Sequence, residues 1–233
     1  MRELDLNAVY AAVAGGSVLA AGGGGWVDHG LLVGTTAVHY GTPRLVTLEE
    51  LDPDDMLATV SAIGAPAAVG WEMRPADYVR ALELLMDAVQ EPIVGTVTAQ
   101  NGSSTTCNGW VASAVLGTLV VDAAGDGRAH PTGKMGSFGL AAADEYQTVQ
   151  AVAGGNRSEN RYLEVVTRGT VRHTANVLRT ASEQSGGFIS AARNPLPASF
   201  VAEHAAVGAI SFALSPETSG YPFRTPTRNP TSA

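Results

Sequence analysis

The order of elements between residues 92 and 131 constrains the fold most strongly. An apolar strand, residues 92–97, leads into a small polar loop, residues 101–108, and an apolar helix follows over residues 109–116. A second apolar run then occupies residues 118–121. A strand–helix–strand unit of this length predicts two parallel strands of one sheet, whose following loops share one sheet edge. We therefore expect the polar loop to lie beside the segment that follows the second strand.

The same alternation of apolar strands and amphipathic helices extends over most of the chain. Helices are predicted over residues 5–14, with Gly15-Gly16 as the stop, and over 26–39, 75–90, 170–182 and 197–205. Strands are predicted over residues 44–48, 56–63, 162–167, 188–193 and 207–214. This pattern predicts a single α/β domain over residues 1–215, with a central, at least partly parallel sheet flanked by helices. Residues 216–233 are rich in Pro and Thr and are expected to form a disordered tail.

Composition and charge exclude several classes of function. The chain has 233 residues, is 45% hydrophobic and carries a net charge of −8 without clustered Lys or Arg, which argues against nucleic-acid and membrane partners. No apolar run approaches the roughly 20 residues of a membrane span. The single cysteine, Cys107, excludes an intrachain disulfide and, with an acidic start, fits a cytoplasmic protein. One cysteine and five scattered histidines predict no structural zinc site, and no cofactor is identified.

Charged and polar residues are concentrated just after the strand that ends at residue 121. Two carboxylates, Asp122 and Asp126, one guanidinium, Arg128, and one imidazole, His130, fall within nine residues. We take Asp122, Asp126 and His130 as candidate acid–base residues and Arg128 as a candidate substrate-binding residue. The alternative is a surface turn, because Asp and Gly are common turn residues.

A run of four glycines, Gly22–Gly25, separates the first two predicted helices. Glycine loops that open a helix present unpaired N–H groups, so Gly23, Gly24 and Gly25 are candidate ligands for an anion or a carbonyl oxygen. The run matches neither a Walker A motif nor a dinucleotide fingerprint, and a plain hinge is the alternative. The pair Asp28-His29 follows directly and is a minor acid–base candidate, although Asp at a helix start is more often solvated.

The polar loop over residues 101–108 is the third candidate region. Asn101 and Ser103 are candidate substrate-binding residues, with helix capping as the alternative. Cys107 precedes a helix, where a thiol can have a lowered pKa and act as a nucleophile. The alternative is a small buried residue.

Taken together, these motifs resemble the S-methyl thiohydantoin desulfurase-like family, in its N-terminal domain. This family was formerly an uncharacterised one, often encoded beside hydantoinases and oxoprolinases. The order and spacing of the motifs carry the resemblance, which extends from the N-terminus to about residue 215. The matching residues are Gly22–Gly25, Gly64-Ala65-Pro66, Val120–Ala123, Gly127-Arg128-Ala129, Pro131, Met135 and Phe138.

The chain departs from the family pattern at several polar positions. Trp26 stands where the family favours Asp, and Ala99–Gly102 replaces a Glu-x-Gly-Gly stretch. Ala124 replaces the second Asp of the family's Asp-Ala-Asp-Gly, while His130 and Thr132 replace an aromatic residue and a Glu. The family usually continues into a second, mostly β domain. The resemblance therefore supports the fold more than the reaction.

The resemblance implies an enzyme that acts on a small five-membered nitrogen heterocycle or its linear precursor, by hydrolysis of a hydantoin or thiohydantoin. Asp122 or His130 would act as base, and the amides of Gly23–Gly25 together with Arg128 would stabilise the anion. Ring closure, dehydration or isomerisation in a biosynthetic pathway would need the same groups. A non-catalytic subunit or binding module that kept the scaffold is the alternative from another class. The chain is 45% hydrophobic, and we expect another copy of it to bury the surface that the family's second domain would cover. This predicts a homo-oligomer.

Overall fold

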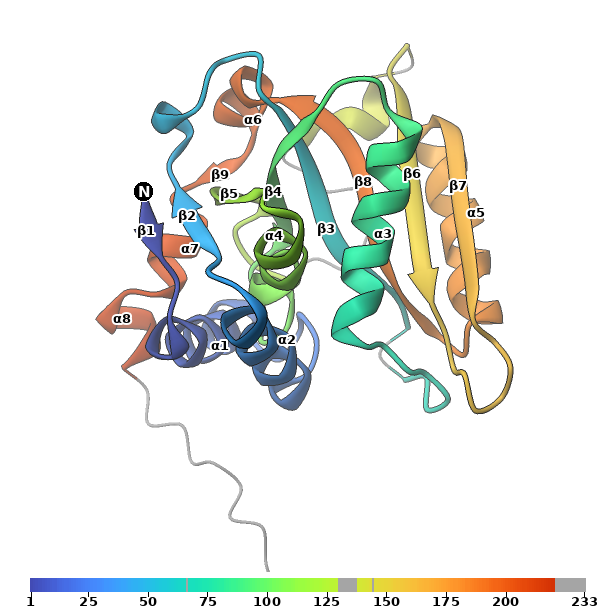
Figure 1. Ribbon diagram of the computed structural model, residues 1–233, viewed down its shortest axis with the longest axis horizontal. Helices are drawn as coiled ribbons and strands as arrows, with labels where there is room; N and C mark the ends of the chain where they lie inside the picture. The colour runs from blue at the N-terminus through green and yellow to red at the C-terminus, as the bar shows by residue number, and fades with distance from the viewer. Residues whose placement is uncertain (66, 130–137, 144, 221–233) are drawn as a thin grey trace, which may run out of the picture.

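One mixed sheet forms the centre of the protein (Figure 1). The computed structural model describes residues 1–65, 67–129, 138–143 and 145–220. Within this part of the chain, nine strands form the sheet in the order β1-β2-β5-β4-β3-β8-β6-β7, and β9 pairs with β5. The strands are β1 (Arg2–Glu3), β2 (Arg44–Val46), β3 (Met56–Gly64), β4 (Ile93–Gln100), β5 (Leu119–Asp126), β6 (Gln147–Gly154), β7 (Leu163–Thr170), β8 (Phe188–Pro197) and β9 (Ala206–Val207).

Helices cover both faces of this sheet. They are α1 (Leu6–Ala20), α2 (Val27–Tyr40), α3 (Pro75–Ala88), α4 (Trp110–Leu116), α5 (Val171–Gln184), α6 (Ala198–His204), α7 (Ala209–Ala213) and α8 (Pro216–Ser219). Short 3-10 turns lie at η1 (Leu48–Glu50), η2 (Thr105–Cys107) and η4 (Leu140–Ala142). None of the described helices is both long enough and apolar enough to cross a bilayer.

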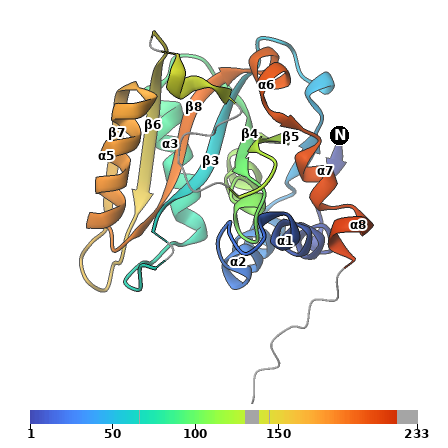
Figure 2. The same ribbon diagram turned by 180° about the vertical axis from the view of Figure 1, so that it is seen from behind.

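The four strands β2, β5, β4 and β3 run parallel, whereas β8, β6 and β7 continue the sheet in antiparallel pairs. The prediction of one α/β fold with a central, partly parallel sheet is therefore confirmed. Figures 1 and 2 show α3 and α4 on one face of the sheet and α5 on the other. Side chains alternate accordingly, since Ala58 and Val60 of β3 pack with α1–α4, while Leu57 belongs to an apolar cluster on the opposite face.

The glycine pair in the first helix corrects one prediction. The helix does not stop at Gly15-Gly16 but continues to Ala20, with Asp5 as its N-cap. A methyl group on Gly15 would come within 1.9 Å of the carbonyl oxygen of Ala213, and one on Gly16 within 2.3 Å of that of Gly102. The two glycines therefore allow close packing against other segments rather than ending the helix.

The end of the chain corrects two further predictions. Residues 207–214 do not form a strand, because β9 ends at Val207 and helix α7 follows. The segment from residue 216, expected to be disordered, begins with the helical turn α8, and residues 221–233 lie outside the described residues.

Two strands in the middle of the chain also differ from the prediction. Strand β6 is absent from the sequence-based prediction, and β5 extends five residues beyond its predicted end at Val121, to Asp126.

Candidate functional site

Three loops meet at the edge of the sheet where the parallel strands β4 and β5 end. The carbonyl oxygen of Gly24 accepts hydrogen bonds from the N–H groups of Ser104 and Thr105, at 2.9 and 3.1 Å. The N–H of Asn101 donates to the carbonyl oxygen of Asp126 at 3.3 Å, which joins the ends of the two strands. We call this region, residues 22–25, 101–107 and 126–129, the three-loop junction. The predicted proximity of the polar loop and the segment after β5 is thus confirmed.

Close packing explains why the first of these loops consists of glycines. Gly24 and Gly25 have positive φ angles of 73° and 86°. A methyl group on Gly24 would come within 2.4 Å of the Cα of Gly102, and one on Gly25 within 2.6 Å of the Cβ of Ser104. The loop is therefore fitted to the polar loop beneath it. It is not a free hinge.

The backbone of this loop also leaves donors for a ligand. The N–H of Gly23 is already used, because it donates to the carbonyl oxygen of Ala20. Helix α2 follows the loop, and its N-cap residue Trp26 makes no capping hydrogen bond through its side chain. Within the part of the chain that the structure describes, the N–H groups of Gly24, Gly25 and the first turn of α2 have no backbone partner, so they are the donors available to an oxygen atom or an anion.

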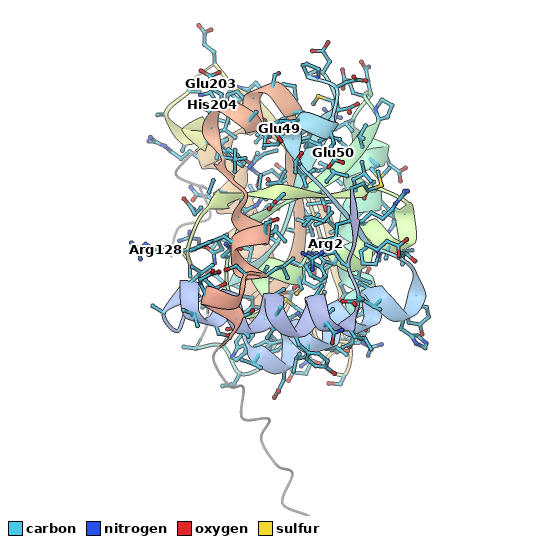
Figure 3. All side chains as sticks on the ribbon, turned by 90° about the vertical axis from the view of Figure 1, so that its left-hand side faces the viewer. Arg2, Glu49, Glu50, Arg128, Glu203 and His204 are labelled. Atoms are coloured by element: carbon cyan, nitrogen blue, oxygen red, sulfur yellow. The ribbon has the colours of Figure 1, made fainter. Side chains whose placement is uncertain are left out.

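Asp126 and Arg128 lie at the junction, as the sequence predicts. Asp126 is the last residue of β5 and is half-buried. Arg128 is exposed, and Figure 3 shows its side chain projecting outward from the surface. Its neighbour Ala129 contacts the glycine loop, since a methyl group on Gly23 would lie 2.7 Å from the Cβ of Ala129. The candidate His130 lies outside the described residues.

Asp122 has a different role from the one predicted. Its side chain is buried within β5, and its Oδ1 accepts the N–H groups of Ile210 and Ser211, each at 2.9 Å. Its Oδ2 accepts the hydroxyl of Ser211 at 2.5 Å. Both oxygens therefore cap the start of α7. Asp122 was predicted to be an acid–base residue of a loop, but it is a strand residue that caps a helix.

Cys107 is likewise part of the core. It lies in η2 and is completely buried, and burial raises the pKa of its thiol to about 12. A thiol with this pKa is protonated at neutral pH and is a poor nucleophile. The prediction of an activated cysteine is wrong because desolvation outweighs the proximity of a helix start.

Asn101 and Ser103 are buried and bonded within the protein. The side-chain amide of Asn101 donates to the carbonyl oxygen of Ala209 at 2.9 Å, and the hydroxyl of Ser17 donates to that of Ser103 at 2.9 Å. Both side chains hold the polar loop in place. A direct contact with substrate stays a prediction.

An aromatic cluster beside the junction escaped the sequence analysis. Trp26 stacks on Trp71 with ring centroids 4.4 Å apart, and the ring of Phe188 meets Trp26 edge-on at 5.0 Å. Beneath them, the Nε2 of the buried His29 lies 3.0 Å from the hydroxyl of Tyr78. Burial lowers the pKa of His29 to about 4, only partly opposed by the charge of Asp77, so the imidazole is neutral at pH 7.

These aromatic residues come from three separate segments and show no periodicity that would have linked them. The pair Asp28-His29 was the one available signal, and it is the histidine that is buried while Asp28 is exposed. Among the described residues, no group of three or more His, Cys, Asp or Glu side chains could hold a metal ion.

Comparison with known proteins places the chain in a family. No curated protein sequence matches it. Its fold is similar to a crystal structure of a protein from Chromobacterium violaceum, with a TM-score of 0.74 and 21% sequence identity. The match covers 94% of this chain and 61% of that chain, so this chain spans about three-fifths of its neighbour's length. A family model described as the S-Me-THD-like N-terminal domain matches residues 7–162, more than half of the chain. The chain therefore belongs to the family of S-Me-THD-like N-terminal domains.

Proposed function

We propose that this protein is an enzyme that acts on a small five-membered nitrogen heterocycle of the hydantoin or thiohydantoin class, at the three-loop junction. The observation that carries the proposal is that the glycine loop meets the segment that bears Asp126 and Arg128 at the carboxyl ends of parallel strands. Ligands of open α/β sheets bind at this edge. The family description supports the thiohydantoin-like ring.

Hydrolysis of an S-methyl thiohydantoin illustrates the chemistry that this site would perform. Water adds to the ring carbon that bears sulfur and is doubly bonded to a ring nitrogen. The C–S bond then breaks to release a thiol, a ring carbonyl forms, and the ring nitrogen keeps the second proton of water. The Asp126 carboxylate would take a proton from water and return it to the departing sulfur. The N–H groups of Gly24 and Gly25 and the Arg128 guanidinium would stabilise the negative charge that develops on the ring.

The aromatic cluster would add a planar apolar surface to this site. Trp26 follows Gly25 directly, so its half-buried ring lies beside the amides that would receive the polar edge of the ligand. A flat heterocycle can stack on an indole while its carbonyl or thiocarbonyl group accepts hydrogen bonds.

The proposal is tested with a panel of S-methyl thiohydantoins, thiohydantoins, hydantoins and linear amide precursors. Thiol release and loss of ring absorbance report hydrolysis, and ring formation from the linear precursors reports the reverse direction. In Arg128→Lys, kcat/KM should fall at least about tenfold, because lysine keeps the charge but loses the planar pair of donors. Arg179→Lys is the matched control, since Arg179 is exposed on α5. Equal activity of the two variants would mean that Arg128 does not stabilise the negative charge that develops on the substrate ring.

A binding domain without catalysis is the second candidate, and one observation favours it. The sequence analysis took Asp122 as a candidate base and Cys107 as a candidate nucleophile. In the structure, Asp122 is buried and bonded to α7, and Cys107 is buried in the core. This candidate predicts saturable binding of a member of the panel with no conversion in either direction. Turnover that depends on Arg128 would eliminate it.

A further inference from the structure

The two ends of the central sheet differ in how much strand they expose. At one end lies β1, which has two residues, and at the other lies β7, which has eight (Figure 1). Strand β7 pairs with β6 along its whole length, from Leu163 to Thr170, without a register shift. Within the residues that the structure describes, no strand pairs with its other side. The outward N–H and C=O groups of β7 therefore form a long, regular edge that another strand can join.

Strand β7 lacks most of the features that protect an exposed edge. Proteins block such edges with very short strands, bulges, proline or lysine. Strand β1 is short, whereas β7 has neither a proline nor a lysine and pairs with β6 without a bulge. Helices α3 and α5 pack against β7, and Figures 1 and 2 show them on opposite faces of the sheet. These helices cover the faces of the strand and not its edge.

The exposed side chains of β7 indicate which strand can join it. Glu164, Val166 and Arg168 lie on one face of the strand, and all three are exposed. On β6, Glu164 is opposite Ala153 and Arg168 is opposite Val149, so neither charge meets an opposite charge across that pairing. Val166 is 43% exposed although it lies near the middle of the strand. This face presents a valine between a negative and a positive charge.

Contacts within the chain hold both charged side chains and leave them room for another partner. Glu164 accepts Nε and Nη2 of Arg80 at 2.8 and 3.0 Å, and the hydroxyl of Tyr162 at 2.8 Å. Arg168 donates through Nη2 to the carbonyl oxygen of Ala88, at the end of α3. A carboxylate has about four acceptor sites and a guanidinium about five N–H donors, so each group can form a further bond.

Symmetry selects one register for two antiparallel copies of β7. Because side chains alternate between faces, a residue must meet its own counterpart at the two-fold axis. With Val166 on the axis, each Glu164 is opposite Arg168 of the second copy. An axis at Glu164 or Arg168 would place like charges directly opposite, which is destabilising. An axis at Val165 or Thr167 would leave both charges opposite uncharged residues.

We propose that β7 is a dimerisation edge, which pairs antiparallel with β7 of a second copy of this chain, with Val166 on the two-fold axis. Main-chain hydrogen bonds join the two sheets into one, and two pairs of Glu164 with Arg168 flank the two valines. This inference goes beyond the proposed function and does not depend on turnover at the three-loop junction. It gives the homo-oligomer expected from the sequence a defined interface.

Sedimentation and light scattering at micromolar concentration test the dimer. The wild-type protein should have twice the mass of the chain. In Val166→Lys two ammonium groups would be directly opposite each other on the axis, so the dissociation constant of the dimer should rise at least about tenfold. Val115→Lys is the matched control and should remain dimeric, because Val115 is a valine of similar exposure, 49%, on α4.

A charge exchange tests the register. Arg168→Glu would place carboxylates opposite Glu164 of the second copy and should also raise the dissociation constant about tenfold. The double variant Glu164→Arg, Arg168→Glu restores two opposite-charge pairs and should recover the dimer. Roles of these side chains within one chain would not produce this recovery.

Disulfide cross-linking tests the axis itself. Residues directly opposite in an antiparallel pair have Cα atoms about 4.5–5.5 Å apart, which a disulfide can span, so mild oxidation should join two chains of Val166→Cys. Tyr162→Cys is the control, because Tyr162 is 40% exposed but its two copies would lie about 26 Å apart along the pair. The native Cys107 is buried in both variants.

Several results would overturn the inference. A wild-type protein with the mass of one chain would do so, and so would a dimer that Val166→Lys leaves intact or that Val166→Cys does not cross-link. Failure of the charge exchange to recover the dimer would refute the register. None of these results bears on turnover at the three-loop junction, so the proposed function would stand. If Val166→Lys does not fold, the cross-linking of Val166→Cys decides the matter.

Discussion

Asp122 and Asp126 lie four residues apart on β5, yet their surroundings differ. Asp122 is covered by α7, and three hydrogen bonds from Ile210 and Ser211 occupy both of its oxygens. Asp126 ends the strand at the three-loop junction and is half-buried. A carboxylate within a covered strand serves the fold, whereas one at the carboxyl edge lies where open α/β sheets bind ligands, which is why we propose the catalytic role for Asp126 and not for Asp122. The residue type alone does not distinguish the two.

The largest expected effect comes from Asp126→Asn. This change keeps the shape of the side chain and removes its basicity, so turnover of any active ring substrate should fall about 10²- to 10⁴-fold with little change in thermal melting. Asp54→Asn, on an exposed turn, is the control and should retain activity. If Asp126→Asn keeps full turnover, the distinction between the two carboxylates has no catalytic meaning.

Asp122→Ala tests the other half of the comparison. Removing the cap leaves the N–H groups of Ile210 and Ser211 unbonded, and the free energy of unfolding should decrease by about 3 kcal/mol. Ser211→Ala should cost about 1 kcal/mol, and much less once Asp122 is already alanine, because the two share a hydrogen bond. Denaturant unfolding measures all three variants. Additive losses would mean that the cap does not act as a unit.

His29 contributes a smaller effect that sharpens these stability measurements. Burial lowers the pKa of its imidazole from 6.5 to about 4, so the unfolded chain binds a proton in this range that the folded protein excludes. Stability should therefore be complete above about pH 6.5 and decrease toward pH 4, by up to about 1.4 kcal/mol per pH unit. His29→Gln should flatten this slope. An unchanged slope would mean that other groups cause the pH dependence of the unfolding free energy. Because the contribution of His29 is constant above about pH 6.5, the stability of the carboxylate variants is best compared above pH 7.

Local sequence patterns were sufficient for much of the fold. Helix α3 begins at Pro75 and buries Tyr78, Leu82 and Leu85, an apolar stripe that the sequence displays directly. Strand β6 gave no such signal, because it buries Thr148 and Gln150 where apolar residues are expected.

The candidate site was predictable only in part. The rule for parallel strands brings the polar loop to the end of β5, and Asp126 and Arg128 lie there as expected. The role of Asp122 could not be predicted, because its partner Ile210 lies 88 residues later in the chain. The helix end predicted at Gly15-Gly16 was wrong for the same reason. The carbonyl oxygen that leaves no room for a side chain at Gly15 belongs to Ala213, far along the chain. Contacts between distant segments leave no periodic trace in sequence.

The contact of the first helix with the last ones has a consequence for how the chain is made. Figures 1 and 2 show α1 beside α7 and α8. Because α1 is synthesised long before α7 and α8, the part of its surface that these helices cover stays exposed until residues 209–219 have been translated. The carboxylate of Asp122 also waits for α7. A nascent chain paused before residue 209 would therefore expose this part of α1 and leave the carboxylate of Asp122 without its partners. Exposed apolar surface of this kind is what chaperones bind.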